Sequence, residues 1–195
     1  MKTKFSIVFF FLLTFLTNSY GQTAEYTSGI TKFISWISEL DDVIANITDK
    51  EELKSIDRQL GYASYDISRI AWQKGYLANS ISELTDASEN DKIDELKPLV
   101  DDLISDIDKL ISRLWIIRGK LSQSDQAAVD QIIEEITSGY RNKKMAFLKE
   151  IKNFLYGEDI PLTQIKEEAI QAKEVADEAS KKIEEARQKI KLKLN

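Results

Sequence analysis

The chain contains neither cysteine nor histidine among its 195 residues. Without cysteine, disulfides, thiolate metal sites and thiol nucleophiles are excluded, and a lipoprotein, which needs an N-terminal cysteine, is not expected. Without histidine, the commonest general base and the commonest zinc ligand are missing. The sequence also has no glycine-rich phosphate loop and no Gly-x-Ser-x-Gly motif. We therefore expect a non-enzymatic protein without a metal or a cofactor, whose fold is stabilised by packing alone.

Long apolar runs are scarce, and the longest lies near the N-terminus. Two lysines precede an apolar run over residues 5–16, and Ser19 and Gly21 place small residues at the −3 and −1 positions of a cleavage site. This pattern predicts a cleavable signal peptide over residues 1–21. An uncleaved membrane anchor is the alternative, although a membrane-spanning helix needs about 20 apolar residues. We expect residues 22–195 to form one exported domain, in the periplasm, at the cell surface or in the medium.

Positive charge is in deficit, because 27 lysines and arginines face 33 acidic residues and leave a net charge of −6. Loss of the signal peptide removes Lys2 and Lys4 and makes the exported domain more acidic still. Nucleic-acid binding needs a positive surface that displaces counterions, so no nucleic-acid partner is expected. The charges are segregated, with ten acids in residues 83–108 and basic clusters in residues 141–152 and from Lys181 onward. These clusters are either solvated faces of the fold or a surface that attracts a charged partner or anionic lipid.

Apolar residues recur every three or four positions along most of the chain, which is the spacing of one face of an α-helix. The series cover residues 30–47, 48–86, 93–121, 129–154 and 162–190. Short connections between such helices favour antiparallel neighbours. We therefore predict an all-α fold: an elongated antiparallel (up-and-down) bundle of one short and four long helices with coiled-coil-like packing.

The series over residues 48–86 is the longest, and we expect it to be the central helix. Its apolar seam consists of Leu53, Ile56, Leu60, Ala63, Ile67, Ile70, Leu77, Ile81 and Leu84. Thr48 and Glu51 have the spacing of a capping box, which predicts the start of this helix. Lys74 interrupts the seam, as Lys143 interrupts a later one; each either reaches out to solvent or pairs with an acid in the interior.

A second stripe runs along the same helix, about 200° around it from the seam. It consists of Tyr62, Tyr65, Arg69, Trp72 and Tyr76. A helix that is apolar on two sides is usually buried, so we expect another helix, the first, to cover this stripe. The alternative is an exposed recognition surface, because Tyr, Trp and Arg are enriched at binding hot spots.

Three other features produce structural expectations. Pro98 lies inside the series over residues 93–121, so that helix either kinks there or becomes regular only near Lys97. Gly61 and Gly75 either weaken the central helix or allow another helix to approach it closely. The series over residues 162–190 is dominated by alanine and buries little area, so we expect its helix to be the most weakly held and its lysine-rich end to fray.

Two functional hypotheses follow from the sequence. The first is an exported bacterial binding protein that contacts a partner protein through the helical face around Trp72. The second is a membrane-active bundle that binds lipid or forms a pore, with the basic C-terminal helix touching the membrane surface. An oligomer is compatible with either hypothesis.

Overall fold

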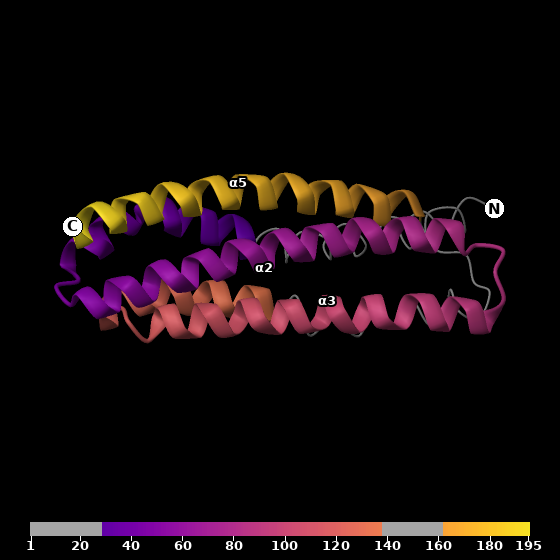
Figure 1. The fold of residues 1–195 in the computed structure, drawn as a ribbon, viewed down its shortest axis with the longest axis horizontal. Helices are drawn as coiled ribbons and strands as arrows, with labels where there is room; N and C mark the ends of the chain where they lie inside the picture. Colours follow the sequence, from indigo (N-terminus) through magenta and orange to yellow (C-terminus); the bar gives the residue numbers. More distant parts are fainter. Residues whose placement is uncertain (1–28, 138–161) are drawn as a thin grey trace, which may run out of the picture.

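The computed structural model describes residues 29–137 and 162–195 of the chain. The predicted signal peptide and most of the fourth helical series, including Lys143, lie outside these residues. Within the described residues the chain forms five helical segments and no strand. The predicted all-α bundle is therefore confirmed, and Figure 1 shows that it is elongated.

The three longest helices among the described residues are α2 (Lys50–Glu83), α3 (Glu89–Arg118) and α5 (Leu162–Leu194). Two further helical segments cover residues 29–46 and 123–137. At 1.5 Å per residue, α2 is about 51 Å long, so it extends along most of the bundle.

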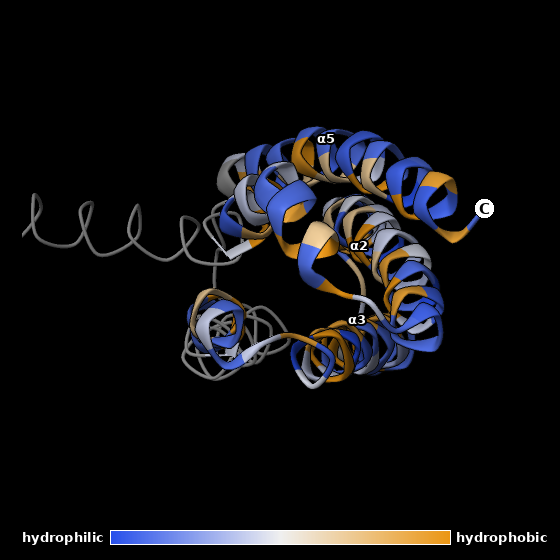
Figure 2. Ribbon diagram, turned by 90° about the vertical axis from the view of Figure 1, so that its left-hand side faces the viewer, coloured by the Kyte–Doolittle hydropathy of each residue, from blue (hydrophilic) through white to orange (hydrophobic). Residues whose placement is uncertain are grey.

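Helix α2 lies between α3 and α5 on one side of the bundle (Figures 1 and 2). Both neighbours are antiparallel to it. Ser64 contacts Ser180 of α5 and Arg69 pairs with Asp106 of α3, and in the next contact along each helix pair the residue number on α2 falls while that on the neighbour rises. The other two segments lie behind these three helices in Figure 1. They are joined to each other by an ion pair between Lys32 and Glu135. The five segments therefore enclose a shared interior.

The interior is built from the seams that the sequence predicts. On α2 every predicted seam residue from Leu53 to Ile81 is buried except Lys74, and Leu84 packs against the same core. Phe33, Leu40, Leu96, Leu110 and Leu114 are fully buried on the other helices. Burying a leucine or isoleucine side chain stabilises a fold by about 1.5–3 kcal/mol, so these seams hold the bundle together.

Helix α2 begins one residue later than the capping-box prediction. Its N-cap is Asp49, whose carboxylate accepts hydrogen bonds from the backbone N–H groups of Glu51 (2.7 Å) and Glu52 (3.3 Å). The prediction of Thr48 as the cap is therefore wrong. An aspartate carboxylate can satisfy two free N–H groups and also complements the positive end of the helix dipole, which a threonine hydroxyl does less well.

Helix α3 runs through Pro98 without a break. Ser88 caps it by accepting from the N–H of Asp91 at 3.3 Å, and helical structure is continuous from Glu89. The alternative in which the regular helix starts near Lys97 is therefore wrong. In the next connection, Ser122 accepts from the N–H of Asp125 at 3.4 Å just before the 123–137 segment.

Helix α5 packs on α2 through its alanines, and one arginine adds a polar clamp. The Arg187 guanidinium donates to both carboxylate oxygens of Asp57, at 2.9 and 3.4 Å. Gly61 makes room for it, because a Cβ at that position would lie 3.1 Å from the Arg187 Cζ. Of the two roles predicted for Gly61, close approach therefore applies, although the approaching group is a side chain rather than a helix backbone.

The end of α5 is held in place, so the expectation that it frays is wrong. Lys193 donates to the backbone carbonyl oxygens of Ile44 and Ala45, where the 29–46 segment ends. Lys189 pairs with Asp41, and Lys50 donates to the carbonyl oxygen of Leu194 at 3.0 Å. Lys193 thus bonds carbonyl oxygens at the end of a neighbouring helix, and Lys189 pairs with a carboxylate of the same segment.

We predict that Lys193→Ala lowers the free energy of unfolding by about 0.5–1 kcal/mol, because the 29–46 segment loses two hydrogen bonds at its C-terminal end and a favourable charge near its dipole. Lys191→Ala is the matched control, since Lys191 lies two residues away and is 3.9 Å from Glu184 on the same helix. Urea denaturation of the two variants measures the difference. Equal stabilities would contradict the capping role of Lys193.

Candidate functional site

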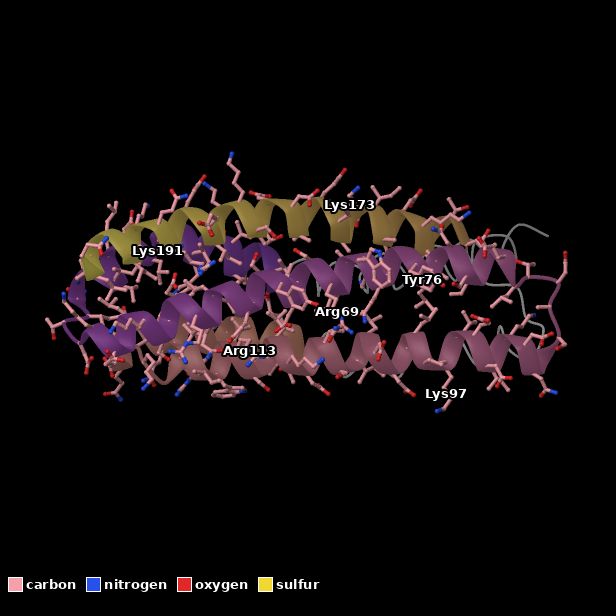
Figure 3. The ribbon with its side chains drawn as sticks, viewed as in Figure 1. Arg69, Tyr76, Lys97, Arg113, Lys173 and Lys191 are labelled. Carbon is pink, nitrogen blue, oxygen red and sulfur yellow. The ribbon has the colours of Figure 1, made fainter. Side chains whose placement is uncertain are left out.

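The five residues of the predicted stripe form an exposed surface on α2, which we call the aromatic strip. It consists of Tyr62, Tyr65, Arg69, Trp72 and Tyr76. The exposed fractions of its aromatic residues are 46% for Tyr62, 62% for Tyr65, 65% for Trp72 and 46% for Tyr76. The expectation that the first helix covers the strip is wrong. That segment lies behind α2 in Figure 1. Figure 3 has the same view and shows Arg69 and Tyr76 on the front of the molecule, so the segment lies on the opposite side of α2 from the strip.

The side of α2 that faces solvent carries no exposed charge over six turns. Between Arg58 and Glu83, the exposed residues of this helix are Tyr62, Tyr65, Ser68, Trp72, Tyr76 and Asn79. The three charged residues of this stretch are not fully exposed: Asp66 is buried, and Arg69 and Lys74 are only partly exposed. Arg69 is also paired with Asp106. Solvent-facing helix surfaces normally carry Lys, Glu, Asp or Arg, as those of α3 and α5 do. The aromatic strip is therefore unlike the remaining described surface.

Contacts within the strip fix its side chains. The rings of Trp72 and Tyr76 stack in parallel, with centroids 5.5 Å apart and an angle of 8° between their planes. The Arg113 guanidinium of α3 lies 4.8 Å from the centroid of the Tyr62 ring. A hydrogen bond with Tyr65 is the largest influence raising the pKa of Arg69, so this side chain stays charged. Aromatic stacking and cation–π contacts each contribute about 0.5–1.5 kcal/mol, enough to hold these rings in preferred positions.

Buried charges close the boundary between the strip and α3. Asp106 of α3 is 1% exposed and receives two cations, Arg69 at 2.7 Å and Lys109 at 2.8 Å. Asp66 of α2 is 4% exposed, and Arg113 lies 3.6 Å from it. Two acids and three cations thus link α2 to α3 along the edge of the strip. The sequence does not single out either acid, although Gln59, Asp66 and Gln73 recur at seven-residue spacing and so mark a polar edge on α2.

On the other side of the strip, α2 and α5 leave an open groove of about 610 Å³. Its floor is made of small residues, including Ala71 and Gly75 of α2 and Ala169 of α5. Its remaining lining residues are Ser68, Trp72, Tyr76, Ala78, Asn79, Lys166, Ile170, Lys173, Ala176 and Asp177. Ile170 is 60% exposed, which is unusual for a β-branched apolar side chain on a charged helix. The apolar spacing of the sequence does not predict this residue, because Ile170 falls outside the seven-residue spacing of the alanines. An apolar residue outside that spacing is the feature of the sequence that could have indicated an exposed apolar side chain.

Lys74 lies in the α2 seam behind the groove. Burial lowers the pKa of its ammonium group, and the negative charge of Glu168 on α5 partly offsets this effect. The Lys74 side chain is partly exposed. Both predicted roles, a reach to solvent and pairing with an acid, therefore stay predictions.

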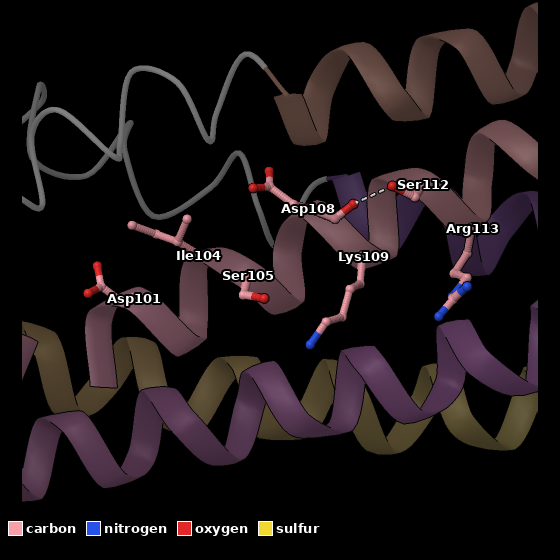
Figure 4. Close-up of a pocket in the computed structure, with 7 residues that line it drawn as sticks. All are labelled: Asp101, Ile104, Ser105, Asp108, Lys109, Ser112 and Arg113. Atoms are coloured by element: carbon pink, nitrogen blue, oxygen red, sulfur yellow. Dashed lines mark hydrogen bonds between the residues drawn. The ribbon is translucent and has the colours of Figure 1, made fainter. Parts of the chain in front are cut away.

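A second depression, of about 550 Å³, runs along α3 (Figure 4). Asp101, Ile104, Ser105, Asp108, Lys109, Ser112 and Arg113 line it. The close-up shows Lys109 and Arg113 directed toward α2, whereas Ile104 and Asp108 point to the other side of α3. Ser112 donates to the carbonyl oxygen of Asp108 at 2.9 Å, a bond within the helix. These side chains diverge, so they do not converge on one ligand.

Within residues 29–137 and 162–195, no three or more acidic side chains come together in a way that could hold a metal ion. None of the helices in these two ranges combines the length and hydrophobicity that crossing a membrane requires. No protein-family model, curated protein or solved structure matches the chain.

The buried carboxyl of Asp66 and the surface carboxyl of Asp130 should affect stability in opposite directions as pH changes. Burial raises the pKa of Asp66 above 3.8, although Arg113 opposes this; a hydrogen bond from Arg118 lowers the pKa of Asp130 below 3.8. An acid whose pKa is raised in the folded state makes the protein less stable as pH rises from 3.8 to the folded pKa. An acid whose pKa is lowered in the folded state makes the protein more stable as pH rises from the folded pKa to 3.8.

We therefore predict that Asp66→Asn gains stability relative to wild type as pH rises from 3 to 6, whereas Asp130→Asn loses stability over the lower part of this range. Urea midpoints measured at half-unit pH steps test both variants together. A relative loss for Asp66→Asn would show that Arg113, rather than burial, controls this carboxyl.

We further predict that Gly75→Ala raises the free energy of unfolding by about 0.5–1 kcal/mol, because alanine is the better helix former and an added Cβ meets no atom within 4 Å. Gly61→Ala is the control, since its Cβ would press on Arg187 and offset the gain. Thermal and urea unfolding measure both. Destabilisation by Gly75→Ala would mean that the groove floor is closed.

Proposed function

We propose that this chain is an exported, non-enzymatic binding protein that holds a partner protein against the aromatic strip of α2. The observation that carries the proposal is that no charged residue between Arg58 and Glu83 is exposed, on a helix face occupied by Tyr62, Tyr65, Trp72 and Tyr76. An exposed aromatic patch rimmed by polar residues is typical of protein-interaction sites.

The rigidity of the strip supports the same proposal. Binding requires that side chains be ordered at the interface, which costs about 0.5–1.5 kcal/mol for each flexible side chain. The stacked rings of Trp72 and Tyr76 and the paired Arg69 are already restrained before a partner arrives. A partner would therefore bind without bearing that part of the entropic cost.

Export is supported by the sequence alone, through the signal-peptide pattern of residues 1–21. The membrane-active alternative has less support than the sequence suggested. It relied on a loosely held, lysine-rich end of α5, and two of those lysines, Lys189 and Lys193, are occupied by contacts to the 29–46 segment.

The test is site-specific photo-crosslinking in the source cells, with a benzophenone amino acid in place of Tyr65. We predict a discrete cross-linked protein whose yield falls at least fivefold when Trp72→Ala is added. Because the Trp72 side chain is mostly exposed, this substitution should lower stability by less than about 1.5 kcal/mol, so loss of the product would report lost binding.

The control places the same photo-crosslinker at Trp115, which is 50% exposed on α3 and away from the strip. This position should give no product of the same mass. Unfolding by Trp72→Ala, or an unchanged yield, would refute the proposal. Cross-linking to lipid alone, together with sedimentation on anionic liposomes, would favour the membrane-active alternative.

A further inference from the structure

The groove between α2 and α5 is long and straight. On α2 it extends from Ser68 to Asn79 and on α5 from Lys166 to Asp177. Each wall is therefore about 17 Å long at 1.5 Å per residue, or three helical turns. Because α2 and α5 are antiparallel, these two stretches lie side by side over their whole length. Small side chains on the floor set the groove back between the two helices.

The walls determine the backbone of an occupant. Both walls are helices, and their backbone N–H and C=O groups are already bonded within each helix. They offer no free sheet edge to an extended peptide, whose backbone groups would lose water without gaining partners. An α-helix satisfies its own backbone and needs only an apolar face to contact the walls. A helix laid in the groove therefore suits this surface better than a strand.

Apolar and charged side chains are arranged along the groove in a defined order. Trp72 and Tyr76 form one wall, and Ile170 of α5 faces them across the floor. On the α5 side the rim holds Lys166 and Lys173, against one acid, Asp177. Figure 3 shows Lys173 on α5, the helix adjacent to the one that carries Tyr76. Lys166 donates to the hydroxyl of Ser82 at 3.3 Å, which leaves its other two protons available.

The two lysines are seven residues apart, so they lie on the same side of α5 and about 10.5 Å apart along its axis. A partner helix parallel or antiparallel to α5 would place acids at the same seven-residue spacing opposite them. The chain has a net charge of −6, so most of its surface attracts basic partners. The two lysines beside the strip repel a basic partner and therefore favour an acidic one at this site.

We infer that the groove receives an amphipathic α-helix of the partner protein, about three turns long, with acidic residues at positions i and i+7 along one edge of its apolar face. The apolar face packs on Trp72, Tyr76 and Ile170, and the acids pair with Lys166 and Lys173. This inference rests on the proposed function and specifies the partner's chemistry.

The test is selection of a phage-displayed library of helix-forming 18-residue peptides on the purified protein and, in parallel, on its Lys166→Glu/Lys173→Glu variant. Phage that also bind an Ile170→Glu variant are discarded, so that only groove binders remain. Both rim lysines are exposed, so the double variant should fold normally. Lys181→Glu is the control, because Lys181 is exposed on α5 about two turns beyond Lys173 and does not line the groove.

We expect wild-type protein to enrich peptides with apolar residues at i, i+3 or i+4 and i+7 flanked by Asp or Glu. The charge-reversed variant should enrich the same apolar pattern flanked by Lys or Arg. Measured by fluorescence anisotropy, an acid-flanked peptide should bind the double variant about fivefold more weakly and the Lys181→Glu variant equally well, as two exposed ion pairs imply.

Other outcomes overturn the inference and separate it from the proposed function. Groove binders without charge preference, or an extended rather than helical consensus, would remove the acidic helix and leave the protein-binding strip in place. No enrichment at all, combined with a Tyr65 cross-link unaffected by Trp72→Ala, would refute both. A dimer that Ile170→Glu dissociates, or binding to phosphatidylglycerol vesicles that Ile170→Glu abolishes, would assign the groove to a second copy or to lipid.

Discussion

The packing of one helix on three sides is the constraint from which the remaining structure follows. Helix α2 buries its Leu/Ile seam against the shared interior and has α3 and α5 on its two flanks. Those contacts leave a single side of α2 open to solvent. The aromatic strip occupies that side because it lies about 200° around the helix from the seam, and no helix can bury both faces unless neighbours surround it completely.

The two flanks of the strip are built differently, and the difference creates the groove. Toward α3, charged side chains cross the boundary: Arg69 of α2 pairs with Asp106 of α3, which Lys109 of its own helix also contacts. Toward α5, alanines and Gly75 bring the helices together without filling the space above them. Buried ion pairs contribute little net stability, so the charges on the α3 side are better understood as fixing the positions of the strip residues than as strengthening the bundle.

The lysine-rich end of α5 shows that composition can suggest a solvated, fraying end where tertiary contacts instead order the chain. Lysines near a chain terminus resemble a solvated, fraying end, and clustered positive charge resembles a lipid-binding site. In the folded chain, however, α5 ends beside the last turn of the 29–46 segment, whose carbonyl oxygens need donors. Lys193 provides them, so the terminal turns become part of the structure that holds two helices together.

The sequence by itself determined the features that depend on local spacing: the helices, the seam from Leu53 to Ile81 and the common face of Tyr62, Tyr65, Arg69, Trp72 and Tyr76. Helical periodicity is fixed by neighbouring residues along the chain, so a sequence suffices to read it. Only the tertiary structure decided which face of α2 stays uncovered, that Ile170 stands opposite Trp72 and Tyr76, and that Asp66 and Asp106 are buried together. These features depend on residues up to about a hundred positions apart, and periodicity says which side of a helix is apolar but not which helix lies against it.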